Sequence, residues 1–101
     1  MIVYISIGNS DNKLKRAEWA EFVRLTDELL VPQAGFVERI HGAWHSIPAR
    51  PFENACWCVE IERPTAIEAV RVGLRALAAK FNQDSITWAV ADTEFLSPVQ
   101  P

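Results

Sequence analysis

The stretch ACWCVEIERPTAIEAVRVGLRALAAKF, residues 55–81, decides the fold because its hydrophobic period changes within it. Its first part alternates apolar residues with small or polar ones, and the apolar positions are Ala55, Trp57, Val59 and Ile61. A period of two residues predicts a strand over 55–62 with one buried face.

The second part of this stretch predicts a helix. Thr65 and Glu68 directly follow Pro64 and have the spacing of a capping box. Apolar residues then recur at helical spacing: Ile67, Val70, Leu74, Leu77, Ala78 and Phe81. The run 82–85 ends this helix, and alternation over 86–91 predicts a final strand.

Upstream, residues 2–7 are rich in β-branched side chains and predict a first strand. The turn-forming run 8–12 follows, and then an amphipathic helix that Pro32 and Gly35 end. Its apolar face carries Leu14, Trp19, Phe22, Val23, Leu29 and Leu30.

The start of this first helix is open from sequence alone. Either Ser10 or Asp11 caps it, or it begins near Arg16 with Leu14 folded back as a hydrophobic staple.

A second strand is predicted over 36–47, with Gly42 indicating a bulge or a close backbone approach. The short link over 48–51 makes this strand and the next an antiparallel hairpin. The order strand, helix, strand, strand, helix, strand predicts an α+β domain over 1–96 with the ferredoxin-like arrangement. In that arrangement both helices cover one face of a four-stranded antiparallel sheet, and 97–101 is a loose tail.

This topology brings three polar clusters to one end of the sheet, with the N-terminus of the first helix pointing there. They are Asn9, Ser10, Asp11 and Asn12; His45, Ser46, Arg50, Glu53 and Asn54; and Asn82, Gln83, Asp84 and Ser85. One interpretation is a site for a phosphate or another anionic ligand, with backbone N–H groups and Arg50 as donors. Asp11, His45 and Asp84 are then candidate acid–base catalysts. The other interpretation is that these residues only cap and brace the turns.

A metal site formed by His41, His45, Cys56 and Cys58 is a weaker hypothesis, because the spacing matches no recognised zinc pattern. The hairpin register decides it. If the numbers of two paired residues add up to an odd value, His45 lies across from Cys56. If they add up to an even value, the histidines and the cysteines lie on opposite faces of the sheet. We therefore expect no metal or other cofactor.

The sheet face away from the helices is predicted to carry few charges at its centre. Its side chains are Tyr4, Ser6, Cys56, Cys58, Glu60, Thr87, Ala89 and Ala91. Such a surface is typical of an interface, so we expect a homodimer or another protein partner there. Trp44 is either a core residue or an exposed contact residue.

Composition restricts the remaining function classes. The formal net charge of −3 with scattered basic residues argues against nucleic-acid binding. No apolar run is long enough to span a membrane, and the opening residues lack the pattern of a signal peptide. The two cysteines lie too close in sequence for an unstrained disulfide, which favours free thiols and the cytoplasm.

The runs 54–60 and 82–88, together with residues 1–11, resemble short hypothetical proteins of bacteriophages and their bacterial hosts. The resemblance extends over most of the chain. It implies a phage or prophage context and carries no activity and no catalytic residue. With no catalytic motif in the chain, the leading hypothesis is a non-enzymatic interaction module, and the alternative is a phosphate- or nucleotide-binding protein or hydrolase.

Overall fold

The computed structural model describes residues 1–31, 35–46 and 53–100. Its elements follow the order β1 (Ile2–Gly8), α1 (Arg16–Leu30), β2 (Arg39–His45), β3 (Asn54–Glu60), α2 (Pro64–Lys80) and β4 (Thr87–Ala91). The fold is α+β, as the sequence predicted.

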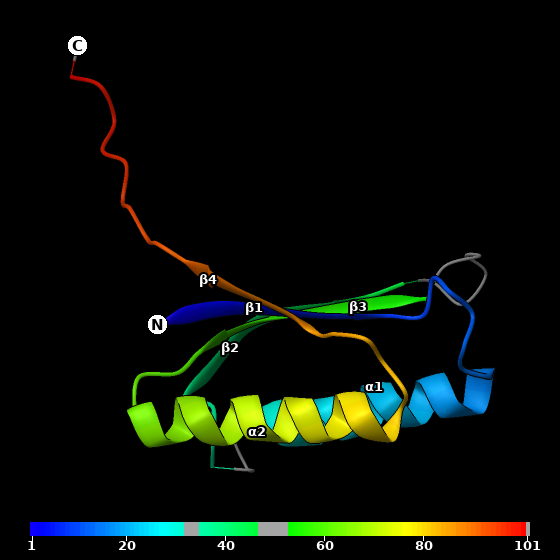
Figure 1. Ribbon diagram of the computed structural model, residues 1–101. Coiled ribbons are helices and arrows are strands. Elements are labelled where there is room, and N and C mark those ends of the chain that lie inside the picture. Colours follow the sequence, from blue (N-terminus) through cyan, green and yellow to red (C-terminus); the bar gives the residue numbers. More distant parts are fainter. Residues whose placement is uncertain (32–34, 47–52, 101) are drawn as a thin grey trace.

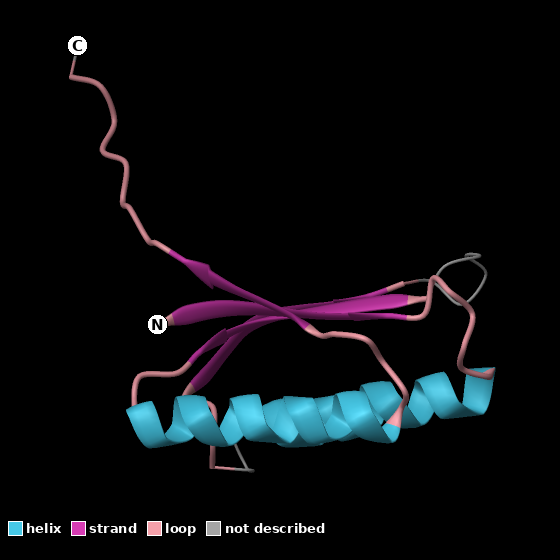
Figure 2. Cartoon of the chain, in the orientation of Figure 1, coloured by secondary structure: helices cyan, strands magenta, loops and turns pink. Residues whose placement is uncertain are grey.

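The four strands form one antiparallel sheet with the order β2-β3-β1-β4. Both helices lie on the same side of this sheet, side by side (Figure 1). Within the described residues, the other side of the sheet carries no helix (Figure 2). The fold therefore has two layers, with the core between them.

The core consists of the inward positions of β1 and β3 and the apolar faces of both helices. Trp57, Phe22, Ile5 and Leu30 are among its largest fully buried side chains. Because Val3 and Ile5 pair with Val59 and Trp57, the strand alternation has the predicted phase.

Helix α1 begins at Arg16, which settles its open start. Leu14 precedes the N-cap residue Lys15 and is buried, and Trp19, at the fourth helical position, is buried too. This is the placement of a hydrophobic staple. The Glu18 carboxylate accepts a hydrogen bond from the backbone N–H of Lys15 at 3.0 Å.

The capping box predicted for α2 is wrong. The helix begins two residues earlier, at Pro64, and its N-cap residue Arg63 makes no side-chain capping bond. Proline needs no N–H partner in the first turn and has its φ fixed near the helical value, so it occupies the first helical position. Thr65 therefore lies inside the first turn.

The predicted bulge in the second strand is confirmed. The pairing of β2 with β3 shifts between Ile40 and Gly42, so the strand changes register there. β2 is an edge strand with mostly exposed side chains, which explains its poor alternation in the sequence.

Between Asp92 and Gln100 the chain forms no helix and no strand. Residues 92–100 are exposed and extend away from the two layers (Figure 1). The predicted tail began at residue 97, but the segment without helix or strand already begins at Asp92.

Candidate functional site

The loops at one end of the sheet converge. Gly8 pairs with Asn54, and the backbone N–H of Asn9 donates to the Glu53 carbonyl at 2.8 Å. Lys13 Nζ lies 3.5 Å from Asp84 Oδ1, which joins the first loop to the loop before β4. The segments 9–13, 53–54 and 82–85 therefore lie together, although they are far apart in the sequence.

A polar cleft of about 310 Å³ lies between these loops. Its lining is Ser6, Ile7, Gly8, Ser10, Asp11, Asn54, Gln83, Asp84, Ser85 and Thr87. Six of the predicted ligand-binding residues are in this list: Ser10, Asp11, Asn54, Gln83, Asp84 and Ser85. Arg50, the predicted anion-binding side chain, lies outside the described residues.

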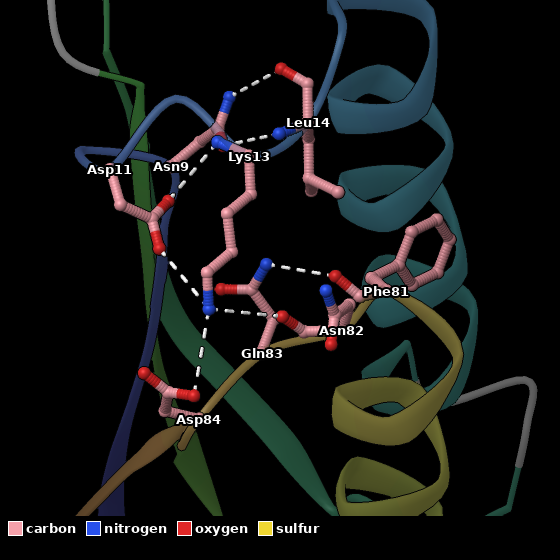
Figure 3. A network of polar contacts seen from close by, with 8 residues as sticks. All are labelled: Asn9, Asp11, Lys13, Leu14, Phe81, Asn82, Gln83 and Asp84. Carbon is pink, nitrogen blue, oxygen red and sulfur yellow. Dashed lines mark hydrogen bonds and ion pairs between the residues drawn. The ribbon is translucent and has the colours of Figure 1, made fainter.

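Lys13 is the centre of the polar contacts beside this cleft (Figure 3). Its ammonium group lies 3.5 Å from a carboxylate oxygen of Asp11 and of Asp84, and 3.4 Å from the Asn82 carbonyl oxygen. Gln83 donates its side-chain N–H to the Phe81 carbonyl. The described charges are thus two carboxylates around one ammonium, a balance that disfavours a phosphate.

Asn9 is the buried anchor of the first loop. Its amide nitrogen donates to the Leu14 carbonyl and to the Glu53 carboxylate, both at 2.9 Å. Its amide oxygen accepts from the Leu14 N–H at 3.0 Å. Because the side chain is only 3% exposed and fully bonded within the protein, it braces the loop and offers nothing to a ligand.

The three predicted acid–base residues do not assemble at one place. Asp11 and Asp84 share the contact with Lys13, but His45 pairs with Ala55 on the edge strand β2. Its ring stacks edge-on against Trp57, with 5.5 Å between centroids, so it lies on the helix side of the sheet. The register carries His45 away from the cleft.

The N-terminus of α1 does not line the polar cleft, contrary to the sequence-based expectation. Seven residues separate β1 from α1, and Leu14 turns into the core before the helix begins. The first-turn N–H groups therefore start beyond the loop and not at the cleft.

The hairpin register separates His45 from the cysteines. Trp44 pairs with Cys56, and His45 pairs with Ala55, an even sum in both cases. The bulge places His41 differently, with its ring nitrogen 3.2 Å from the Glu60 carboxylate. Over residues 1–31, 35–46 and 53–100, no group of three or more histidine, cysteine or acidic side chains is arranged to hold a metal ion.

The sheet side without helices, here called the open face, is the second candidate site. The pairs Tyr4–Cys58, Tyr4–Ala89, Ser6–Cys56 and Ser6–Thr87 define its centre. Trp44 joins it beside Cys56 and is 58% exposed, while Tyr4 is 45% exposed. Trp44 is thus exposed and is not a core residue.

Charged side chains border both ends of the described open face. At one end Arg39 pairs with Glu60 and His41 contacts that same carboxylate. At the other end Asp11 and Asp84 line the polar cleft together with Ser6 and Thr87. The neighbouring Cys58 thiol raises the pKa of the Tyr4 hydroxyl above its usual value through hydrogen bonding and charge interaction. Two aromatic rings, those of Tyr4 and Trp44, are exposed to water on this face.

Two features of the described structure are not among the predictions from the sequence. Lys13 was not assigned to the polar cluster, although it directly follows the turn residues of the first loop. Arg71 and Arg75, four residues apart on α2, line a groove beside β4, and their helical spacing is the signal that would have placed them on one face.

Comparison of the chain with protein-family models, with curated proteins and with solved structures gives no match in any of the three. Neither helix of the described structure has the length and apolar character needed to cross a bilayer.

Proposed function

We propose that this protein is a small interaction module that forms a homodimer through the open face. The observation that carries this proposal is the exposure of Trp44 and Tyr4 on a sheet centre without charged side chains. Exposed aromatic residues are enriched at protein interfaces because they bury a large area with few rotatable bonds.

The shape of the surface supports the same proposal. All four strands contribute to one open face, and its central residues Tyr4, Cys56, Cys58, Thr87 and Ala89 include no acidic or basic side chain. A solvated antiparallel sheet normally places polar residues there. Two such faces related by a two-fold axis bury the same patch on each copy. The charged end with Arg39, His41 and Glu60 then lies at the rim.

For the fold class, we propose the ferredoxin-like arrangement. Counted from the other edge, the strand order is β4-β1-β3-β2, and the two helices connect strands that are not neighbours in the sheet. Split β-α-β units joined by a hairpin produce such an order.

For its setting, we propose a cytoplasmic protein of phage or prophage origin. Cys56 and Cys58 are both free thiols, which supports a reducing compartment. The resemblance of residues 54–60 and 82–88 to short phage proteins supports the origin.

The test is the self-association of variants measured by sedimentation equilibrium. Trp44→Asp places a carboxylate at the centre of the open face and is expected to weaken association roughly tenfold or more. Ala20→Asp is the matched control, because Ala20 is exposed on α1, on the other layer. An unchanged association constant in Trp44→Asp, or a monomeric wild type at high protein concentration, contradicts the proposal.

A further inference from the structure

The edge strand β4 lacks the usual protection against pairing with another chain. It forms hydrogen bonds to β1 on one side only, and its sequence TWAVA contains no charge and no proline. Edge strands in monomeric proteins are normally blocked by charges, prolines or bulges. On the opposite edge, β2 has a bulge and begins at Arg39.

The segment that follows β4, residues 92–100, is here called the C-terminal arm. Its apolar side chains are almost completely exposed: Phe95 at 92%, Leu96 at 83% and Val99 at 95%. Two acidic residues, Asp92 and Glu94, precede them. An arm of this composition gains free energy when it lies against a surface with apolar and basic groups.

A groove of about 460 Å³ between α2 and the start of β4 offers such a surface. Its apolar groups include Leu74, Ala78, Ile86 and Trp88, and its basic groups are Arg71 and Arg75. The Arg71 guanidinium lies 5.2 Å from the centre of the Trp88 ring. This groove is separate from the open face, because Trp88 pairs with Ile5 on the helix side of the sheet.

The geometry points to an exchange of C-terminal arms between two copies, in which β4 pairs antiparallel with β4 of the second copy and each arm crosses the partner's α2–β4 groove. Antiparallel pairing sets the end of one β4 beside the start of the other. The arm that continues from Ala91 then runs along residues 83–86 of the second copy, which line the groove.

Side-chain parity and charge agree with this placement. In an extended arm, Asp92, Glu94 and Leu96 fall on the same side as Trp88 and Val90, the side that faces the helices. Two carboxylates and Leu96 then face the partner groove, whose charged lining residues are Arg71, Arg75 and Asp84. Phe95 and Val99 fall on the other side of the extended arm. Val90, 58% exposed in a single copy, becomes covered at the same junction.

The chain's own groove is a poor place for its own arm. The groove lies beside the start of β4, and the arm leaves from the end of β4 and leads away from the two layers (Figure 1). In an antiparallel second copy, the groove lies beside the end of the first copy's β4. The arm therefore reaches that groove without reversing its chain direction.

The experiment compares the full chain with a chain ending at Thr93, by sedimentation equilibrium from micromolar to millimolar protein. Far-ultraviolet circular dichroism checks that β4 and the core are retained, since the deleted residues are exposed. We expect the truncation to weaken association roughly tenfold or more. Glu94→Arg and Arg75→Glu are expected to weaken it singly, and their combination is expected to restore it, because each junction then regains an opposite pair.

Arg16→Glu is the control for net charge, since Arg16 is exposed at the start of α1. Equal association of the truncated and full chains, or no recovery in the double variant, overturns the arm exchange. The open-face proposal fails separately: Trp44→Asp then has no effect while the arm variants still do. A wild type that stays monomeric overturns both.

Discussion

Tyr4 on β1 and Cys58 on β3 lie directly opposite each other at the centre of the open face. The thiol raises the pKa of the tyrosine hydroxyl, first through a hydrogen bond and then through charge interaction. The titration of Tyr4 is therefore a probe of the open face, through which we propose that the protein dimerises.

Because Tyr4 is the only tyrosine in the chain, its titration can be followed directly by ultraviolet absorbance. We expect a pKa above the usual value of about 10. Cys58→Ala is expected to return the pKa toward that value. Cys56→Ala, the control, should change it less, because Cys56 makes the smallest contribution. A tyrosine pKa at or below the usual value contradicts the prediction.

The sign of the stability effect follows from this shift. A pKa raised in the folded state favours the protonated hydroxyl, so the contribution to stability is complete below the unfolded-state pKa. It is lost as the pH rises through the folded-state pKa. The stability of the wild type should therefore fall between these two pKa values, and that of Cys58→Ala should fall less over the same pH range.

The buried Asn9 side chain makes a second prediction. Asn9→Ala leaves the buried Leu14 N–H and carbonyl without their side-chain partner, and should lower the free energy of unfolding by about 2 to 3 kcal/mol. Urea unfolding followed by circular dichroism measures this change. Asn12→Ala removes an exposed amide from the same loop and is the control for loss of a surface polar group. It does not control for backbone conformation, because Asn12 has a φ of 57°, which favours asparagine over alanine.

Asn9→Asp separates charge from shape at the same position. Its carboxylate would face the Glu53 carboxylate and the Leu14 carbonyl oxygen, so the folded state should raise the pKa of the introduced group. The stability of this variant relative to the wild type should therefore fall as the pH rises from about 4 to about 7. A difference that is constant over this range would show that the two acceptors do not face the position.

The contacts of Lys13 lead to a third prediction. All of its partners are solvent-exposed to some degree, and Asp84 is 95% exposed. A double-mutant cycle with Lys13→Met and Asp84→Asn should give a coupling below about 1 kcal/mol. High salt should reduce it further, because exposed charges are screened. A coupling above about 2 kcal/mol that salt does not change would contradict a solvent-exposed ion pair between Lys13 and Asp84.

The order of elements could be predicted from the sequence because two kinds of periodicity are clear in it. The alternation over 55–61 and the helical spacing over 67–81 both depend on one buried face each. The start of α2 was misplaced because Thr65 and Glu68 match a local motif, while Pro64 fits the first helical turn better. The irregular β2 was harder, because an edge strand exposes both faces and sequence alternation then disappears.

The convergence of polar loops could also be predicted, because it follows from chain direction alone. The position of His45 could not, since a shift of one residue in the hairpin register moves the side chain to the other face. Lys13 was overlooked because a lysine in a loop carries no sequence signal for the carboxylates it will meet. Asp11 lies in the same loop, but Asp84 is 71 residues away in the sequence and no local pattern points to it.

The contact between Trp57 and Asp27 gives the last prediction. The indole N–H of Trp57 donates to the Asp27 carboxylate at 2.6 Å, and this bond joins β3 to α1. Trp57 is only 1% exposed, so removal of its acceptor leaves a buried donor without a partner. Asp27→Ala should therefore lower the free energy of unfolding by about 1 to 2 kcal/mol, even though alanine favours helix.

Asp27→Asn is the matched control, because its amide oxygen can still accept the bond, and we expect it to cost under about 1 kcal/mol. A cycle that adds Trp57→Phe isolates the bond, since phenylalanine keeps much of the ring without the N–H group. The coupling between positions 27 and 57 should be about 1 to 2 kcal/mol in urea unfolding. A coupling near zero would mean that the ring is held by packing alone, and that the carboxylate contributes nothing to the docking of α1 on the sheet.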